Sequence, residues 1–320
     1  MREVILPVNP APLISGQTSY TYPLMLLPGG EEAESCFIAN SYINCYYDKT
    51  YFDIYEQDYY FQNNGLFERR AEYADNRRIE SETHSVLMYF YRQICKGYAI
   101  TGHWNEELVD GATGSCDEEC LMHGVDPDDG KLYVISISGA SPRSYVVSAE
   151  TFFKARCTGP EGYIWYVFIK PLKNTVSVID KEKILSDYRD FICSANRKNV
   201  FDDGRSYGIG YIDAYKRYVD SCIKSEERLD ALNAVSMLDH KIATKIRLEY
   251  LRRHDMLLSD DLIEAYDSVL SVFKRHIEMV TEYNKSLSAE VGSEIIHSMT
   301  EAKDRELMCA LNLVCSLNDN

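Results

Sequence analysis

The stretch CDEECLMHGVDPDDGKLYVIS (116–136) contains two apolar runs separated by turn-forming residues. The runs EECLMHGV (118–125) and KLYVISI (131–137) have the composition and length of β-strands. The loop DPDDG (126–130) between them consists of residues that favour tight turns. The stretch therefore predicts an antiparallel β-hairpin.

Two other interpretations of the same stretch are weaker. Cys116 and Cys120 are four residues apart, but no second cysteine pair or histidine pair completes a zinc set. The loop resembles half of a calcium-binding EF-hand loop, but it lacks the closing glutamate at the twelfth position. We therefore expect neither a metal nor a cofactor here.

Short apolar runs and turns continue on both sides of the hairpin. Residues 1–30 are rich in proline and glycine turns, so they are expected to be irregular, and 34–48 fits either a helix or a pair of strands. The other expected elements are a helix at 81–97, strands at 98–104, 141–148 and 162–171, and a short helix at 148–157 capped by Ser148. This order predicts an α+β fold with a mostly antiparallel sheet.

The chain changes character near residue 180, where apolar residues begin to recur with the helical period. Helices are expected at 180–196, 208–225, 226–254, 259–287 and 289–316. The predicted organisation is an α+β domain at 1–178 and a helical extension at 179–320. No linker rich in glycine, serine or proline separates the two, so the extension is expected to pack on the first domain.

Composition and charge exclude several classes of protein. The formal net charge of the 320 residues is -16, and a negative surface repels nucleic-acid backbones. The longest strongly apolar run, GYIWYVFI (162–169), is too short to cross a bilayer, and the N-terminus does not resemble a signal peptide. A cytoplasmic protein without nucleic-acid or membrane partners is expected. The ten scattered cysteines are then expected to be free thiols, mostly buried.

Several segments resemble one known family. They are LLPGGEEAESCFIANSYINCYY near the start, ICKGYAITGHW, EECLMHGVDPDDGKLYVIS, SAETFFKA, YGIGYIDAYKRYV and LDHKIATKIRLEYL. Together they cover most of residues 20–255, and they are similar to the butirosin biosynthesis acyltransferase N-terminal domain. That family has a papain-like cysteine-protease fold and is found with nonribosomal peptide pathways. The resemblance implies a papain-like α+β domain followed by a helical region.

The resemblance also implies a thiol-dependent, amide-forming acyltransferase. In such an enzyme a cysteine thiolate attacks a thioester on an acyl or peptidyl carrier protein, and a histidine takes the thiol proton and later serves a small amine acceptor. Cys36 and Cys45 lie in the segment where the family would place the cysteine. His103, in GHWNEE, is a further candidate for a general base.

The chain departs from the family at the other catalytic positions. The family histidine falls on Glu118 and the orienting acid on Ser136, and neither residue can fill the standard role. His123 lies five residues after Glu118 on the opposite face of an ideal strand, so it could substitute only if the strand were bulged or the register were shifted. The alternative function is therefore a catalytically degenerate accessory or docking protein for carrier-linked intermediates.

A locally basic helix offers a surface for such a partner. Lys241, Lys245, Arg252 and Arg253 fall on neighbouring turns within DHKIATKIRLEYLRRH (239–254). Carrier proteins are generally acidic, so this face could bind one. The alternative is a solvated helix face that makes ion pairs within the chain.

Overall fold

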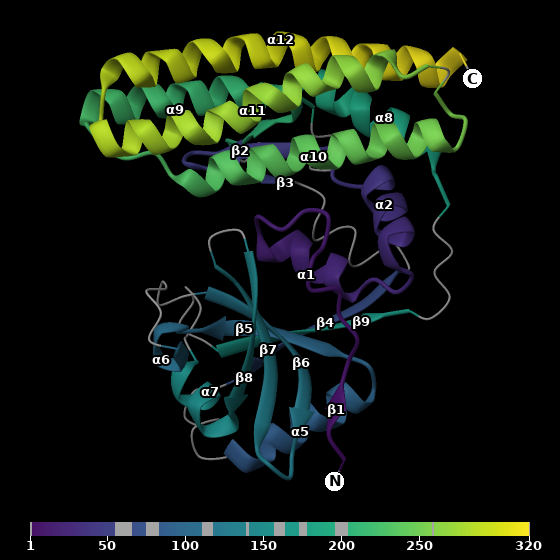
Figure 1. The fold of residues 1–320 in the computed structure, drawn as a ribbon, viewed down its shortest axis with the longest axis vertical. Helices are drawn as coiled ribbons and strands as arrows, with labels where there is room; N and C mark the ends of the chain where they lie inside the picture. Colours follow the sequence, from purple (N-terminus) through teal and green to yellow (C-terminus); the bar gives the residue numbers. More distant parts are fainter. Residues whose placement is uncertain are drawn as a thin grey trace. The chain divides into compact units, whose positions relative to one another are not determined.

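The computed structural model describes residues 2–54, 66–74, 83–110, 118–138, 141–156, 164–172, 178–195, 204–257 and 259–319. The chain divides into two compact units. The first contains Met1–Glu34 and Tyr59–Val176, and the second contains Ser35–Asp58 and Ser177–Asn320. Each unit is described by itself below, and Figure 1 gives the labels of the helices and strands.

The first unit is built on an antiparallel sheet with the strand order β4-β9-β5-β6-β7-β8, and β1 pairs with β6. The strands are β1 (Val4–Ile5), β4 (Phe67–Ala74), β5 (Ala99–Trp104), β6 (Glu118–Asp126), β7 (Lys131–Ser138), β8 (Ser141–Ser148) and β9 (Ile164–Pro171). The helices are α1 (Thr18–Leu26), α5 (Thr83–Cys95), α6 (Glu107–Asp110) and α7 (Ala149–Ala155). The α+β class and the antiparallel sheet are confirmed.

The core of this unit lies on the face of the sheet that meets α5 and α7. Along each strand alternate residues point to opposite faces, so every second residue enters this core. Its largest buried side chains include Phe90, Trp104, Phe152 and Phe168. Helix α1 packs against β6 and β9. The expectation that residues 1–30 would be irregular is wrong for α1, which forms even though it contains Pro23.

The hairpin at 116–136 is confirmed as β6 and β7, although Cys116 lies outside the described residues. In the turn the Asp126 carboxylate accepts hydrogen bonds from the backbone N–H groups of Asp128 and Asp129, both at 3.1 Å. The register shifts between Met122 and Gly124, which marks a β-bulge. A Cβ atom at Gly124 would lie 2.9 Å from the Tyr133 ring, so the close pairing of the strands there needs glycine.

The second unit combines a small sheet with long helices. The sheet has the order β10-β2-β3, formed by β2 (Cys45–Asp48), β3 (Tyr51–Ile54) and β10 (Ser206–Tyr207). The helices are α8 (Lys181–Ile192), α9 (Tyr211–Ser225), α10 (Ala231–Arg253), α11 (Asp261–Ser286) and α12 (Ala289–Asp319). Helix α2 (Gly30–Asn40) runs from the first unit into the second. The expected helical C-terminal region is confirmed.

The domain boundary expected at 178/179 lies near the observed one, but Ser35–Asp58 belongs to the second unit. This segment belongs to the second unit because its strand pairing and hydrogen bonds are made with residues of that unit. Strand β2 pairs with β10. Asn233 of α10 donates to the carbonyl of Thr50 at 2.7 Å and accepts from the N–H of Phe52 at 2.7 Å. That the helical region packs on the first unit stays a prediction.

A tight contact joins α8 to the turn that begins α9. Gly208, in GIG (208–210), has a φ of +51°. A Cβ atom at this position would lie 2.3 Å from the carbonyl oxygen of Phe191, so only glycine fits. The short glycine motif is therefore a packing feature. Within the described ranges no helix combines the length and apolar character that crossing a bilayer requires.

Candidate functional site

The N-terminus of α1 meets the face of the sheet opposite to the aromatic core. Thr18, the first residue of α1, donates its hydroxyl hydrogen to the Glu119 carboxylate at 2.5 Å. One turn later the Tyr22 hydroxyl donates to the backbone carbonyl of Glu119 at 2.6 Å. A carboxylate near a helix N-terminus is also favoured by the partial positive charge of that end. These contacts fix the first turn of α1 on β6.

A histidine lies beside this pair on the neighbouring strand. His103 of β5 is the Cα partner of Glu119 in β6, so their side chains lie on the same face of the sheet. That face is opposite to the one where Ile100 and Trp104 enter the core. Thr18, Glu119 and His103 are all half-buried. The group offers a hydroxyl, a carboxylate and an imidazole to a polar ligand, and the carboxylate favours amine or amide N–H groups.

The sequence analysis singled out His103 but missed Thr18 and Glu119. It placed the family histidine on Glu118, whereas Glu119 is the residue that meets α1. Glu118 begins β6 as the Cα partner of Trp104, and its side chain lies outside the described part of the chain. Glu118 and Glu119 occupy positions on opposite faces of the sheet, because neighbouring residues of a strand alternate. Ser136 is buried as the partner of Cys120.

His123 occupies another place on β6. The bulge that the sequence analysis required for it is present, between Met122 and Gly124. Its ring nitrogen Nδ1 lies 3.3 Å from the carbonyl oxygen of Leu6, and its ring lies edge-on to Tyr133 with the centroids 6.5 Å apart. Burial lowers the pKa of His123. The histidine thus packs beside the segment that follows β1.

Both candidate nucleophiles belong to the second unit, whereas His103 and His123 belong to the first. Cys45 is fully buried in β2, and its sulfur lies 3.9 Å from the carbonyl oxygen of Gly208. Burial raises the pKa of the Cys45 thiol, so it is protonated at neutral pH and a poor nucleophile.

The other thiol is buried as well. Cys36 of α2 is 1% exposed and packs with Ala39, Ile179 and Tyr250. In the described part of the chain, no three histidine, cysteine, aspartate or glutamate side chains are grouped so that they could hold a metal ion.

The interior of the second unit contains a polar cluster that the sequence analysis did not find. Lys241 of α10 is fully buried and donates to the carboxylate of Glu306 on α12, whose side chain is 4% exposed. Lys241 also donates to Nδ1 of His240 at 2.8 Å, which fixes His240 as the neutral tautomer that donates from Nε2 to the Ile43 carbonyl at 2.9 Å. Burial is the main cause that lowers the pKa of His240, and the neighbouring Lys241 lowers it further.

Aromatic rings surround the charged end of Lys241. Its ammonium nitrogen lies 4.9 Å from the ring centroid of Phe273, 5.0 Å from that of Tyr211 and 5.9 Å from that of Phe191. Such cation–π contacts are strongest where water is excluded. The cluster therefore ties α10 to α8, α9, α11 and α12.

Arg247, two turns along α10, binds the end of α2. Its guanidinium donates to the carbonyls of Ile38 at 3.1 Å, of Ala39 at 2.9 Å and of Ser41. A helix C-terminus leaves several carbonyls without intrahelical partners, and here a buried arginine donates to carbonyls at the end of α2. The Ile38 carbonyl also accepts from the N–H of Ser41 at 3.1 Å. A hydrogen bond from Arg247 to the Tyr188 hydroxyl at 3.0 Å extends this contact to α8.

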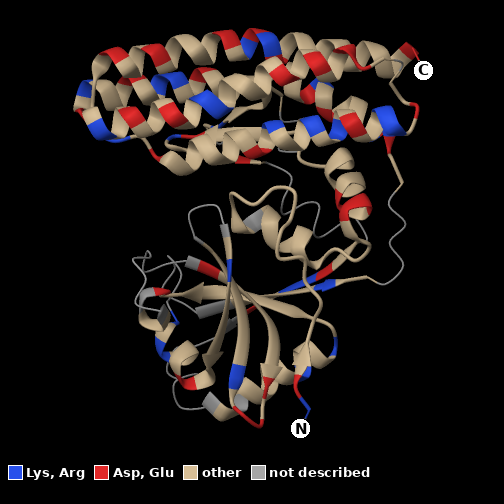
Figure 2. Ribbon diagram, in the orientation of Figure 1, with Lys and Arg blue, Asp and Glu red and all other residues tan. Residues whose placement is uncertain are grey.

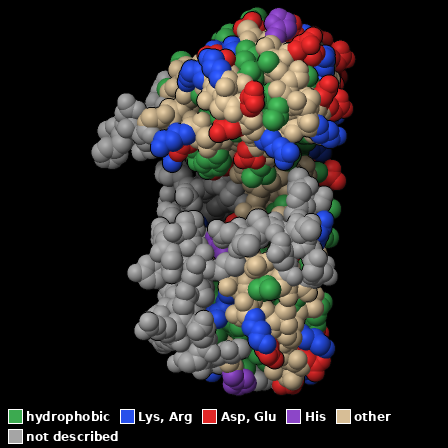
Figure 3. Space-filling model, turned by 90° about the vertical axis from the view of Figure 1, so that its left-hand side faces the viewer, with side chains coloured by type: hydrophobic (Ala, Val, Ile, Leu, Met, Phe, Trp, Pro, Cys, Tyr) green, Lys and Arg blue, Asp and Glu red, His purple; other side chains and the backbone are tan. Residues whose placement is uncertain are grey.

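These contacts remove Lys241 from the basic face of α10 that could bind a carrier, and docking at the remaining basic residues stays a prediction. Lys241 is buried and paired with Glu306. Lys245 pairs with Asp267, and Arg252 pairs with Asp260 at 2.8 Å. Figure 2 shows the positions of basic and acidic residues following one another along α10, α11 and α12, and Figure 3 shows the same mixture on one face of this unit. The alternative interpretation, a helix with ion pairs within the chain, fits Lys245 and Arg252.

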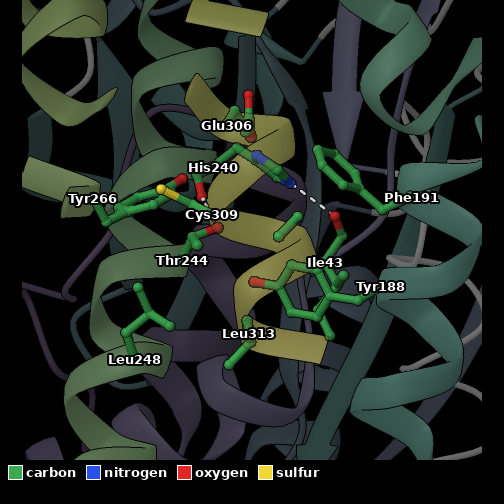
Figure 4. A pocket seen from close by; sticks show the side chains of 11 residues that line it. Ile43, Tyr188, Phe191, His240, Thr244, Leu248, Tyr266, Glu306, Cys309 and Leu313 are labelled. Carbon is green, nitrogen blue, oxygen red and sulfur yellow. Dashed lines mark hydrogen bonds between the residues drawn. The ribbon is translucent and has the colours of Figure 1, made fainter. Parts of the chain in front are cut away.

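A small cavity lies next to the polar cluster (Figure 4). Its lining comes from α8, α10, α11, α12 and Ile43. The space open to the centres of water molecules is about 10 Å³, so the cavity is too small for an acyl chain or an amino acid.

No protein-family model matches the chain, and no curated protein matches it. A functional assignment therefore depends on the residues and their geometry, together with the resemblance of the sequence segments.

Proposed function

We propose that this protein is a catalytically degenerate relative of the papain-like acyltransferases, which binds carrier-linked intermediates as an accessory or docking protein. The observation that carries the proposal is the burial of both candidate thiols. Cys36 and Cys45 are each no more than 1% exposed, and burial raises the pKa of Cys45. A thiol-dependent acyl transfer needs a thiolate that the thioester can reach.

The residues at the N-terminus of α1 support the same proposal. A helix N-terminus lowers the pKa of a cysteine placed there, so it is a favourable position for a catalytic thiol. This chain has Thr18 in that position, and the hydroxyl donates to Glu119. The Thr18 hydroxyl supplies no thiol at this position, but with Glu119 and the neighbouring His103 imidazole it can hydrogen-bond a polar ligand.

The class of ligand rests on the resemblance. The pantetheine arm of a carrier has two amide groups, and their N–H groups suit a carboxylate acceptor such as Glu119. The acyltransferase interpretation remains the competing proposal, in which Cys36 or Cys45 becomes exposed and forms an acyl-enzyme.

Calorimetric titration with an acyl-pantetheine thioester tests the proposal, while mass spectrometry follows the amount of intact thioester. We expect the wild-type protein to bind the thioester without consuming it, and Thr18→Val and Glu119→Gln to weaken binding. Glu150→Gln is the matched control, because Glu150 is exposed in the same unit and pairs only with Lys154 among the described residues. Absence of binding by the wild-type protein would refute the docking role. Consumption that disappears in Cys36→Ala or Cys45→Ala would establish the acyltransferase instead.

A further inference from the structure

The carboxylate of Glu119 has one engaged oxygen and one open oxygen. Oε2 accepts the hydroxyl hydrogen of Thr18 at 2.5 Å. Oε1 has no hydrogen-bond partner among the residues that the structure describes, and the side chain is half-buried, so a ligand can reach it. The strand around Glu119 is held in place, because its backbone carbonyl accepts from the buried Tyr22 hydroxyl at 2.6 Å. The open oxygen is therefore a positioned hydrogen-bond acceptor.

Thr18 presents a second acceptor beside it. A hydroxyl has a single hydrogen, and Thr18 donates its hydrogen to Glu119. The remaining lone pairs of the Thr18 oxygen can only accept. His103 lies on the same face as the Cα partner of Glu119, and a neutral imidazole has one acceptor nitrogen. The pair of Thr18 and Glu119 thus suits a ligand group that has two or more N–H donors.

The negative charge of Glu119 lacks a cationic partner in the described ranges of the chain, where no lysine or arginine forms an ion pair with it. Thr18 supplies only a neutral hydrogen bond. A half-buried carboxylate attracts a cation more strongly than a carboxylate in bulk water does, because the effective dielectric constant is lower. A charge-assisted hydrogen bond is also about twice as strong as a neutral one. A primary ammonium group, which has three N–H donors and a positive charge, therefore matches the site better than the neutral amides of pantetheine.

We propose that the site at Thr18 and Glu119 binds a primary ammonium group of its ligand. The inference rests on the proposed docking function and adds the chemical class of the ligand. The ammonium group belongs either to an aminoacyl chain on the pantetheine arm or to a small free amine. In both cases it donates to Glu119 Oε1 and to the Thr18 oxygen, and ligands that lack an amine bind more weakly.

Calorimetric titration with two pairs of matched compounds tests the proposal. β-Alanyl-pantetheine and butyryl-pantetheine have the same size and differ in the ammonium group, and an amide replaces the thioester in both so that the protein cannot consume them. β-Alaninamide and butyramide are the same pair without the pantetheine arm. We expect the wild-type protein to bind the ammonium compound of at least one pair about tenfold more tightly than its neutral partner. A preference within the first pair alone identifies the aminoacyl chain as the source, and a preference within the second identifies a free amine.

Glu119→Gln keeps the size of the side chain and removes its charge. We expect this variant to bind the two members of each pair equally, whereas the control Glu150→Gln should keep the wild-type preference. A preference that persists in Glu119→Gln would overturn the proposal, because the ammonium group would then bind elsewhere. If Glu119→Gln fails to fold, the comparison within the wild-type protein decides.

The wild-type titrations also separate this proposal from the docking function. Equal binding of the two pantetheine compounds, with no preference for β-alaninamide, would overturn the ammonium site and leave the docking role intact. Binding of β-alaninamide without binding of either pantetheine compound would support the ammonium site and refute the docking role. Absence of binding by all four compounds would overturn both.

Discussion

Replacing Glu306 with leucine should destabilise the helical unit far more than an ordinary surface substitution. Lys241 is fully buried, and Glu306 supplies the opposite charge that compensates for its burial. Leucine removes that charge and leaves the ammonium with only the His240 nitrogen, at 2.8 Å, and three aromatic rings. Breaking a buried ion pair by removing one partner costs about 3–5 kcal/mol. We therefore expect Glu306→Leu to lower the free energy of unfolding by about that amount.

Urea denaturation followed by far-ultraviolet circular dichroism measures this loss. Glu301→Leu is the matched control. Glu301 lies on the same helix, its side chain is 52% exposed, and its partners His297 and Arg305 lie 3.5 Å and 3.7 Å away. An exposed pair of this kind contributes at most about 1 kcal/mol. The double variant Glu306→Leu with Lys241→Met should recover most of the loss, because a buried pair can be replaced by apolar side chains at little cost. If Glu306→Leu costs no more than Glu301→Leu, our account of the buried cluster is wrong.

Three further predictions concern the thiols, Arg247 and pH. In native protein, iodoacetamide should alkylate the buried Cys36 and Cys45 much more slowly than the exposed cysteines, which are Cys95, Cys193 and Cys315. Peptide mapping that finds Cys45 alkylated first would contradict the assigned burial. Arg247→Met should lower the free energy of unfolding by at least about 2 kcal/mol in urea, because it removes the buried guanidinium that donates to the carbonyls of Ile38, Ala39 and Ser41. Arg253→Met, on an exposed arginine of the same helix, should have a small effect. Burial lowers the pKa of His276 from 6.5 to about 4, so the unfolded chain binds the proton first as the pH falls. The unfolding free energy should therefore decrease from pH 6.5 towards pH 4 by up to about 1.4 kcal/mol per pH unit from this residue, and an unchanged slope in His276→Leu would refute the assignment.

The elements with strong local signals were predictable from the sequence. The hairpin at 118–138 follows from two apolar runs and the turn-forming Asp126, whose carboxylate caps the turn. The short helix after β8 begins at Ser148, whose hydroxyl accepts from the N–H of Thr151 as expected of an N-cap. Helix α5 ends two residues before Gly97, which has a φ of +88°. Each of these signals lies within a few residues of its effect.

Features that depend on distant partners were not predictable in the same way. The path of Ser35–Asp58 into the second unit depends on pairing with β10, which is about 160 residues away in the sequence. Helix α1 was missed because Pro23 and the preceding glycine and proline residues favour irregular structure. The Thr18–Glu119 pair then depends on where α1 packs, which no local pattern of residues gives.

The helical period of α10 predicts the burial of Lys241, although the charge of a lysine favours an exposed position. Met237, Lys241, Thr244, Leu248 and Leu251 recur at intervals of three and four residues, and all of them are buried. The helical period therefore places Lys241 on the apolar face of α10. A lysine is so rarely buried without a partner that this position alone would have suggested an acidic residue nearby, but not which one.

Intact-mass spectrometry after incubation with an acyl-pantetheine thioester tests the central claim most directly. An acyl-enzyme adds the mass of the acyl group to the protein, and peptide mapping identifies the residue that carries it. Our account predicts an unmodified protein mass when the thioester is present at saturating concentration, because Cys36 and Cys45 are buried and Thr18 is paired with Glu119. A stoichiometric acyl adduct on Cys36, Cys45 or Thr18 that transfers to an added amine would contradict it.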